Sequence, residues 1–532
     1  MNRLIYFLIG IFSFFILLFF SLAIHPFEVP DEQSHYATVH YLVNEGTMPI
    51  LSKHADLSLE EEKTEYLLGV MSEGNNQYSH HPQFRLSPAA GVIGLYEKEI
   101  RSLNTAPLRR TYTIHQAAIY PPLYYYLTIP FYSLAGSSDI LSRLFSSRLS
   151  SVLLSTAMIL FAYWFGHVVF AEKKLALILA IMTLFFPMTS YVGAGVNSDN
   201  LHNLLFTIFL GLCVRLIKSG LDTRFTVLTA LVIGLDILTK PQAYIMLPIF
   251  ALAIILRGNF GDWRRSIREL IYFTLTIVVV AGWLHQPQYL DTGTGMIAQS
   301  VLYGGWSNFL TFTRHYFTLA GPMLVWYWGV FKWFGVVLPH PVWWVANRLV
   351  LLSLVGIIIS FVGDWRQHRF SLANKIVIFS LLANVGYLAA LLWFDWQFYE
   401  QIGRSLGLQA RYFLPLLITQ MFLLLSGLSH LSRSPQVKKY LWWGIMIFFL
   451  TLHLAGLYTQ LTSYYDLTTL RTFINQISQY KPIYAKGNWW YLWFSLYFTG
   501  IIGLCSLAFS SSSQPTTKPK SSSLPSKISK HT

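Results

Sequence analysis

Two adjacent carboxylates, Asp31 and Glu32, follow the first apolar segment of the chain, residues 4–24, and His35 comes four residues after Asp31. Carboxylates are costly close to hydrocarbon, so a pair at the edge of a membrane usually binds or transfers something. A general base at this depth could reach a lipid-linked substrate and a water-side acceptor together. A helix start, with Asp31 as N-cap and Glu32 in the first turn, explains the pair equally well and is worth about 1–2 kcal/mol.

Six cations form a second chemical feature. Each lies at or near the end of a predicted membrane span, on the external side of the membrane. The six residues are Arg143, Arg148, Lys240, Arg314, Arg404 and Arg411. A phosphate at such an interface favours arginine, whose planar guanidinium can form two parallel hydrogen bonds. Snorkelling, or pairing with Asp395 and Glu400, explains any one of these cations alone. Six cations converging at one depth favour a phosphate site.

Two further acids lie near span ends. Asp236 precedes Lys240 by four residues, which is the favourable order for an ion pair on one helix face. We expect that pair to form, and it argues against a proton relay through Asp236. Asp199, within the segment Val196–Asn200, is explained either as part of an N-cap for the next span or as a second acid facing Asp31.

Membrane spans are the elements that must position these residues. Of 532 residues, 54% are hydrophobic and 12% are charged, which indicates an all-α polytopic membrane protein. About 17–25 apolar residues are needed to cross a bilayer. We predict about twelve spans, within a range of about eleven to thirteen. They are residues 4–24, 149–170, 175–192, 201–217, 225–239, 243–257, 270–285, 349–363, 374–393, 412–429, 440–459 and 488–508.

The basic residues predict the orientation, because cytoplasmic loops are enriched in Lys and Arg. The net charge of +14 gathers in one set of loops and in the C-terminal tail, which predicts a cytoplasmic-membrane protein with both termini in the cytoplasm. Anionic lipid headgroups account for this charge without nucleic acid. We expect one transmembrane domain, 1–509, with external loops at 25–148 and 286–348 that carry interfacial helices. Residues 510–532 form a predicted disordered cytoplasmic tail.

Several short motifs occur in a characteristic order. The Asp-Glu pair follows the first span, Pro121–Tyr125 reads Pro-Pro-Leu-Tyr-Tyr, and Arg148 leads into the second span. The later motifs are Asn197–Asp199, Leu238–Lys240, Tyr327–Gly335 and Leu408–Pro415. The order of these motifs resembles the GT-C glycosyltransferases, in particular the protein-mannosyltransferase and aminoarabinose-transferase superfamily. The two distal motifs are similar to a bacterial branch of uncharacterised membrane proteins.

The resemblance implies transfer of a sugar from a polyprenyl-phosphate carrier to an acceptor at the outer face of the cytoplasmic membrane, with inversion. It implies that Asp31 is the general base. Lys240, Arg411 and Arg148 would neutralise the leaving phosphate. Glu32 and Asp199 would position the acceptor or a divalent cation, on which members of the family differ. The other implied substrate-binding residues are His35, Arg404, Gln409 and Tyr120, at whose position the family usually has His or Lys.

Two other functions share the membrane setting. One is a transporter of lipid-linked sugars or polysaccharides, which should show broken helices and unpaired charges at mid-membrane. The other is a polysaccharide polymerase or ligase, which differs in using a much larger donor. The predicted concentration of charge at one interface favours the transferase. A cell-envelope glycan, a lipid and a protein all stay open as the acceptor.

Overall fold

A computed structural model describes most of the chain. The described residues are 2–49, 58–70, 90–103, 116–170, 172–220, 222–258, 263–283, 310–314, 320–332, 335–402 and 410–510. They form a helical bundle with one antiparallel ribbon, in which β1 (Val330–Phe331) pairs with β2 (Val336–Val337). The all-α polytopic fold predicted from the sequence is confirmed.

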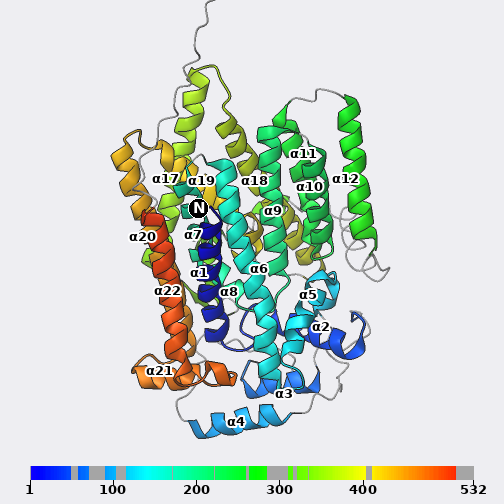
Figure 1. The fold of residues 1–532 in the computed structure, drawn as a ribbon, viewed down its shortest axis with the longest axis vertical. Coiled ribbons are helices and arrows are strands. Elements are labelled where there is room, and N and C mark those ends of the chain that lie inside the picture. The colour runs from blue at the N-terminus through cyan, green and yellow to red at the C-terminus, as the bar shows by residue number, and fades with distance from the viewer. Residues whose placement is uncertain are drawn as a thin grey trace, which may run out of the picture.

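Long helices run side by side along the bundle, and several of the short helices lie towards one end (Figure 1). The long helices are α1 (Asn2–Ala23), α6 (Ile140–Val169), α7 (Lys173–Phe185), α9 (Asp199–Ser219), α10 (Thr223–Ile237), α11 (Met246–Arg257), α12 (Trp263–Trp283), α17 (His340–Arg366), α18 (Leu372–Ile402), α19 (Leu417–His430), α20 (Pro435–Tyr464) and α22 (Trp489–Ser510). The short ones are α2 (Glu32–Glu45), α3 (Leu59–Leu67), α4 (Ala90–Ser102), α5 (Leu123–Leu134), α8 (Pro187–Gly193), α16 (Ala320–Trp326), α21 (Leu470–Ile477) and the 3₁₀ turns η1 (Gln116–Ile119), η2 (Pro241–Ile245), η4 (Ala410–Leu416) and η5 (Ile483–Ala485).

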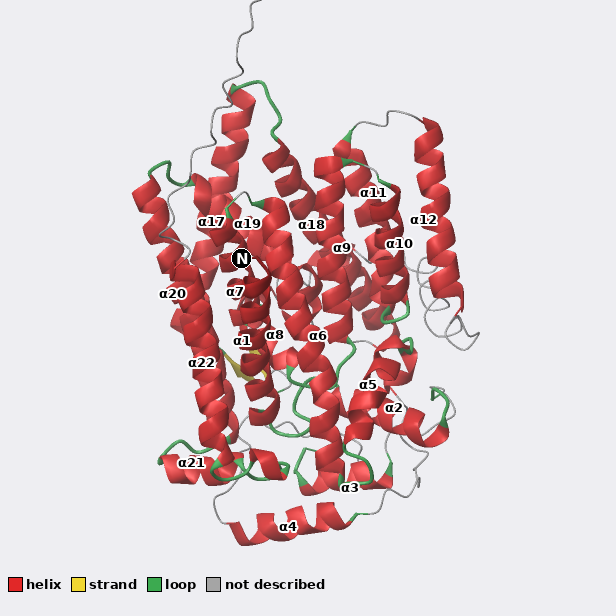
Figure 2. Ribbon diagram, viewed as in Figure 1, coloured by secondary structure: helices red, strands yellow, loops and turns green. Residues whose placement is uncertain are grey.

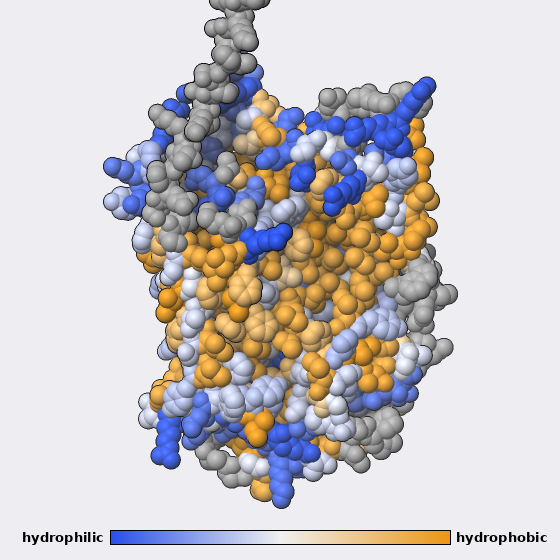
Figure 3. All heavy atoms as spheres, in the orientation of Figure 1, coloured by the Kyte–Doolittle hydropathy of each residue, from blue (hydrophilic) through white to orange (hydrophobic). Residues whose placement is uncertain are grey.

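The surface carries a broad apolar belt between two polar ends, as a bilayer requires (Figure 3). Loops and turns lie mainly beyond the ends of the long helices (Figure 2). In the described part of the chain, eight helices are long and apolar enough to cross a membrane, or nine if the bent pair α7–α8 counts as one span. A helix lies at each of the twelve predicted spans, but the count of twelve is not confirmed. At about 1.5 Å per residue, for example, α10 is shorter than a bilayer core.

Small residues let neighbouring helices approach closely, which is a common device where lipid provides no hydrophobic drive for association. Helices α17 and α19 meet at Gly356 and Gly427. A Cβ added at Gly356 would lie 1.9 Å from the carbonyl oxygen of Gly427. Helix α1 packs between α6 and α22, and part of its surface stays exposed at the side of the bundle.

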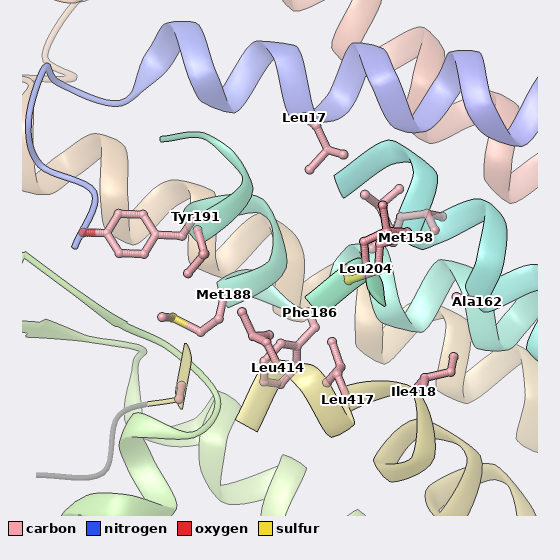
Figure 4. Close-up of a cluster of buried hydrophobic side chains, with 14 of the residues drawn as sticks. Leu17, Met158, Ala162, Phe186, Met188, Tyr191, Leu204, Leu414, Leu417 and Ile418 are labelled. Atoms are coloured by element: carbon pink, nitrogen blue, oxygen red, sulfur yellow. The ribbon is translucent and has the colours of Figure 1, made fainter. Parts of the chain in front are cut away.

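A broken helix shapes the centre of the bundle. Helices α7 and α8 meet at an angle of 60° around Phe186, and Pro187 begins α8. Proline lacks an N–H and favours a helix start, which explains the break at this residue. Figure 4 shows how the break packs against the rest of the core. The side chains drawn there include Phe186, Met188, Tyr191, Leu17, Met158, Ala162, Leu204, Leu414, Leu417 and Ile418.

Two boundaries differ from the sequence prediction. Helix α6 begins at Ile140, inside the segment that we predicted as external loop, because the Asp139 carboxylate accepts a hydrogen bond from the backbone N–H of Ser142 and caps the helix. Helix α17 likewise begins at His340, before the end of the predicted loop 286–348. Helix α5, within the predicted external loop 25–148, begins directly after Pro122. The tail 511–532 lies outside the described residues.

Candidate functional site

Two ion pairs meet where the short helices join the bundle. The Oδ2 atom of Asp31, at the start of α2, lies 2.8 Å from a terminal guanidinium nitrogen of Arg411 in η4. Asp199, at the start of α9, pairs with Lys240, which follows α10. The Lys240 ammonium also lies 5.0 Å from the ring centre of Tyr120. Five residues that are distant in the sequence thus form one charged cluster.

The carboxylate of Asp31 does not cap α2, although the sequence admitted that interpretation. Its side chain makes no capping hydrogen bond, and its backbone is left-handed, with φ 59°. This conformation costs a non-glycine residue on the order of 1–2 kcal/mol. The Asp31 side chain is 28% exposed, whereas that of Arg411 is 6% exposed. Asp31 therefore has a strained backbone and is the more accessible member of the ion pair.

The predicted pair between Asp236 and Lys240 is wrong. Helix α10 ends at Ile237, and Lys240 is extended, with φ −150° and ψ 143°. Because Lys240 has left the helix, its side chain no longer lies above Asp236, and it reaches Asp199 instead. The carboxylate of Asp236 pairs with His202, whose Nδ1 lies 2.8 Å from Oδ2.

Glu32 points away from Asp31 and into the protein, where it forms a bidentate ion pair with Arg148. The Arg148 Nε atom lies 2.7 Å from Glu32 Oε1, and a terminal nitrogen lies 2.6 Å from Oε2. The backbone N–H groups of Phe27 and Val196 also donate to this carboxylate, at 3.0 Å each. Both side chains are fully buried. Glu32 is therefore held at four points.

Arg148 has no donor to spare for a phosphate. An arginine carries five N–H groups, and two of those of Arg148 bind Glu32. The other three donate to the backbone carbonyls of Ser21, Ile24 and His25 at 2.8–3.1 Å. We therefore exclude Arg148 from the phosphate-binding set that the resemblance implied.

The remaining predicted cations divide between the site and other places. Arg143 lies in α6 and pairs with Glu60 of α3 at 2.7 Å, in a separate buried ion pair. Arg314 is exposed. Arg404 and the predicted substrate-binding residue Gln409 lie outside the described residues. Of the three other predicted cations that the structure describes, Lys240 and Arg411 reach the cluster, and Arg314 makes no described contact there.

His35 lies beneath this cluster on α2. Its ring stacks on Tyr120, with centroids 5.4 Å apart, and its Nδ1 atom lies 2.9 Å from the Tyr125 hydroxyl. Burial lowers the pKa of His35 to about 4, against the opposing effect of Asp31 and Asp199. The imidazole is therefore neutral at neutral pH. Burial also raises the pKa of Tyr120, which remains a phenol that can donate a hydrogen bond.

Sequence reasoning missed several residues that organise the site. The Asn197 side chain donates to the Pro30 carbonyl at 2.8 Å, and its backbone N–H donates to the Tyr124 hydroxyl at 2.8 Å. These bonds fix the loop before α9 against the start of α2. His202 was also missed, although its position one helical turn after Asp199 was visible in the sequence.

The cluster gives no support for a bound metal. Within the described ranges, no group of three or more His, Cys, Asp or Glu side chains is arranged to hold a metal ion. Asp31, Asp199 and Glu32 are each paired with a cation. The divalent cation that the resemblance left open therefore has no part in the proposal below.

Comparison with known protein families shows to which family the chain belongs. A family described as predicted membrane proteins, DUF2142, matches residues 14–420. The chain belongs to this family. Together with the apolar helices, this membership makes the chain a multi-pass membrane protein. No protein of curated function matches the sequence.

Three solved structures share a loose similarity in overall fold. ArnT from Cupriavidus metallidurans bound to undecaprenyl phosphate is 13% identical, with a TM-score of 0.41 over 93% of this chain and 76% of that chain. Its apo state gives 13% identity and a TM-score of 0.42 over 93% and 75%. The oligosaccharyltransferase of Archaeoglobus fulgidus, in complex with Zn and sulfate, is 13% identical, with a TM-score of 0.41 over 85% of this chain and 53% of that chain. All TM-scores are below 0.5, so we draw no function from them.

The ion pair of Glu32 predicts a large cost for Glu32→Gln. The change leaves Arg148 as a buried, uncompensated charge, which typically costs about 3–5 kcal/mol. Thermal unfolding of the purified protein should show a clearly lower Tm. Combining it with Arg148→Met should recover part of the loss, and the exposed Glu172→Gln is the control. A Glu32→Gln protein with the wild-type Tm would contradict this role.

Burial of His35 predicts a loss of stability in acid. With a pKa of about 4 in the folded state, against about 6.5 unfolded, the unfolded chain binds a proton that the folded chain does not. The free energy of unfolding should therefore fall as the pH drops from about 6.5 towards 4, by up to about 1.4 kcal/mol per pH unit. His35→Gln should flatten the dependence of Tm on pH. Equal slopes for His35→Gln and wild type would refute the assignment.

Proposed function

We propose that this protein is an inverting glycosyltransferase that moves a sugar from a polyprenyl-phosphate carrier to an acceptor hydroxyl. The observation that carries the proposal is the ion pair between Asp31 and Arg411 beside the pair between Asp199 and Lys240. One partly exposed carboxylate and two cations lie together at an end of the apolar belt. A base and a phosphate-binding pair are the parts that this reaction needs.

In the proposed reaction, Asp31 takes the proton of the acceptor hydroxyl as its oxygen attacks the anomeric carbon. The bond between that carbon and the carrier phosphate breaks, and its electron pair goes to the phosphate oxygen. Attack opposite the leaving group inverts the configuration. The phosphate gains one negative charge, which Arg411 and Lys240 stabilise. Atoms and charge balance without a cofactor.

Arg411 is suited to this role by its unused donor. Its guanidinium binds Asp31 and, at 3.2 Å, the Tyr412 hydroxyl, and both bonds come from one terminal nitrogen. Its buried Nε has no hydrogen-bond partner among the described residues. A buried N–H without a partner costs on the order of 1–3 kcal/mol, and a carrier phosphate would satisfy it. Arg411 would then contact the base and the leaving group at once.

The buried groups would position the reacting ones. Glu32 and Arg148 fix the loop before Asp31, and Asp199 holds Lys240 in place. His35 and Tyr120 supply neutral side chains beside the carboxylates. We assign these residues to positioning and substrate binding, with Asp31 alone as the base. The donor is a polyprenyl-phosphate sugar, and the acceptor is a cell-envelope glycan, a lipid or a protein.

A transporter of lipid-linked sugars is the second candidate, because one observation favours it. The break between α7 and α8 is the kind of discontinuous helix from which transporters build substrate sites. A polymerase or ligase would use the same chemistry with a larger donor. Purified protein in detergent separates the transferase from the transporter, because a transferase cleaves the donor without any membrane to cross.

The role of Asp31 predicts that Asp31→Asn abolishes turnover while the protein still folds. Asparagine keeps the size of the side chain, its amide oxygen can still accept the hydrogen bond from the Arg411 guanidinium, and no capping bond is lost. Removal of a general base typically lowers the rate by about 10²–10⁴-fold. The measurement is release of polyprenyl phosphate from a radiolabelled polyprenyl-phosphate sugar, with Tm as the check on folding. Near-normal turnover by a stable Asp31→Asn protein would exclude Asp31 as the base.

The proposal also requires that the end of the bundle with α2, α3 and α21 faces the outside, in the cytoplasmic membrane. A single cysteine at the exposed Lys63 should react with a membrane-impermeant maleimide in intact cells, in a background without Cys213 and Cys505. A cysteine at the exposed Val437, at the opposite end, should react only after permeabilisation. The reverse pattern would place Asp31 in the cytoplasm and overturn the proposed orientation.

A further inference from the structure

A buried histidine and aspartate lie directly behind the charged cluster. His202 of α9 and Asp236 of α10 have side chains that are 3% and 0% exposed. The His202 Nδ1 atom lies 2.9 Å from Asp236 Oδ1 and 2.8 Å from Oδ2. We refer to these two residues as the His202–Asp236 pair. The resemblance to glycosyltransferases assigned no role to either residue.

The His202–Asp236 pair is tied to the proposed phosphate site by both of its members. His202 follows Asp199 by three residues, so the two side chains lie on one face of α9. The backbone N–H of Lys240 donates to the Asp236 carbonyl at 2.8 Å. Asp199 with Lys240, and His202 with Asp236, therefore make two successive connections between the same two segments.

The free ring nitrogen of His202 distinguishes this pair from a simple helix contact. Its Nε2 atom is fully buried and has no hydrogen-bond partner among the described residues. An unsatisfied buried polar atom costs on the order of 1–3 kcal/mol. A contact that only joined α9 to α10 would not need a side chain with a second polar atom. Such an orphan in a native protein needs an explanation, and a ligand at Nε2 would provide one.

The carboxylate of Asp236 decides how His202 can act. With Nδ1–H donating to Asp236, the ring is held in one orientation, as in other histidines that are backed by a carboxylate. In the imidazolium form, Nε2–H is a second donor, and the adjacent carboxylate balances the positive charge. Such a group can donate to an anion without adding net charge to the protein interior.

The depth of His202 indicates which part of the donor it meets. Helix α9 rises about 1.5 Å per residue, so His202 lies about 4.5 Å further into the bundle than Asp199. A carrier phosphate that contacts Lys240 and Arg411 has its sugar towards Asp31 and its prenyl chain towards the apolar belt. A hydrogen-bond donor at the depth of His202, behind Lys240, would therefore contact the phosphate from the side of the prenyl chain.

We propose that His202, oriented by Asp236, is an additional binding residue for the carrier phosphate and contacts it through Nε2–H from the lipid side. This inference rests on the proposed function, because it assumes a polyprenyl-phosphate donor. His202 takes no part in the proton transfer, because the proton of the acceptor goes to Asp31. Asp236 is a positioning residue that acts through His202.

Two substitutions of His202 separate binding from a structural role. In His202→Asn, the amide nitrogen replaces Nδ1 and keeps the bond to Asp236 but removes the donor at Nε2. In His202→Gln, the amide reaches the place of Nε2 and loses the bond to Asp236. If His202 binds the phosphate, His202→Asn should weaken phosphate binding more than His202→Gln does. If the pair is only structural, His202→Gln should lower the Tm more than His202→Asn does.

The experiment measures binding of polyprenyl phosphate to purified protein, with polyprenol of the same length as the control without phosphate. Loss of one charge-assisted hydrogen bond should weaken phosphate binding by His202→Asn about 10- to 100-fold, while polyprenol binding stays unchanged. His202→Gln should lie between His202→Asn and wild type. In turnover, the KM for the donor should rise for His202→Asn.

The failures of the two proposals are distinguishable. Wild-type protein that binds polyprenyl phosphate no better than polyprenol would overturn the proposed function. Wild-type protein that prefers the phosphate and loses this preference on Lys240→Met, while His202→Asn binds like wild type, would overturn only the role of His202. Weaker binding by His202→Gln than by His202→Asn would also overturn it, in favour of a purely structural pair.

Discussion

The buried ion pair between Glu32 and Arg148 joins parts of the chain that are far apart in the sequence. Arg148 donates hydrogen bonds to three backbone carbonyls at the end of α1. Glu32 accepts hydrogen bonds from backbone N–H groups in the loop after α1 and in the loop before α9. Neither partner can be removed alone without leaving a charge in the protein interior. The position of Asp31 follows from this pair, because Asp31 is the neighbouring residue and its backbone has little freedom to move.

The same principle of pairing organises the candidate site. Asp31 and Asp199 each face a cation from a different element, so four charges are held at the edge of the apolar belt with no net charge. Desolvation of a paired set is far less costly than desolvation of single ions. The left-handed backbone of Asp31 and the orphan Nε of Arg411 are local costs that remain. Local costs of this kind cluster at functional sites.

The broken helix α7–α8 gives these pairs a place to form. A straight helix over residues 173–193 would carry the loop before α9 away from α2. The bend at Phe186 instead brings Gly195 against Val29, where an added Cβ would lie 2.5 Å from the valine Cβ. Glycine is needed for this close approach. The hydrogen bonds of Asn197 to Pro30 and Tyr124 then close the contact.

The sequence by itself determined the helical membrane fold, the places of most helices and the two acids and two cations of the cluster. Apolar runs and polar breaks are local properties, and charges near span ends stand out in an apolar chain. Only the tertiary structure decided the partners. Lys240 pairs with Asp199 and not with Asp236, because helix α10 ends between Asp236 and Lys240. Arg148 lies in the protein interior, because Glu32 and backbone carbonyls accept hydrogen bonds from all of its N–H groups. The partner of each charged residue depends on where a helix ends and on contacts between distant segments. The spacing of residues along the sequence does not show either of these.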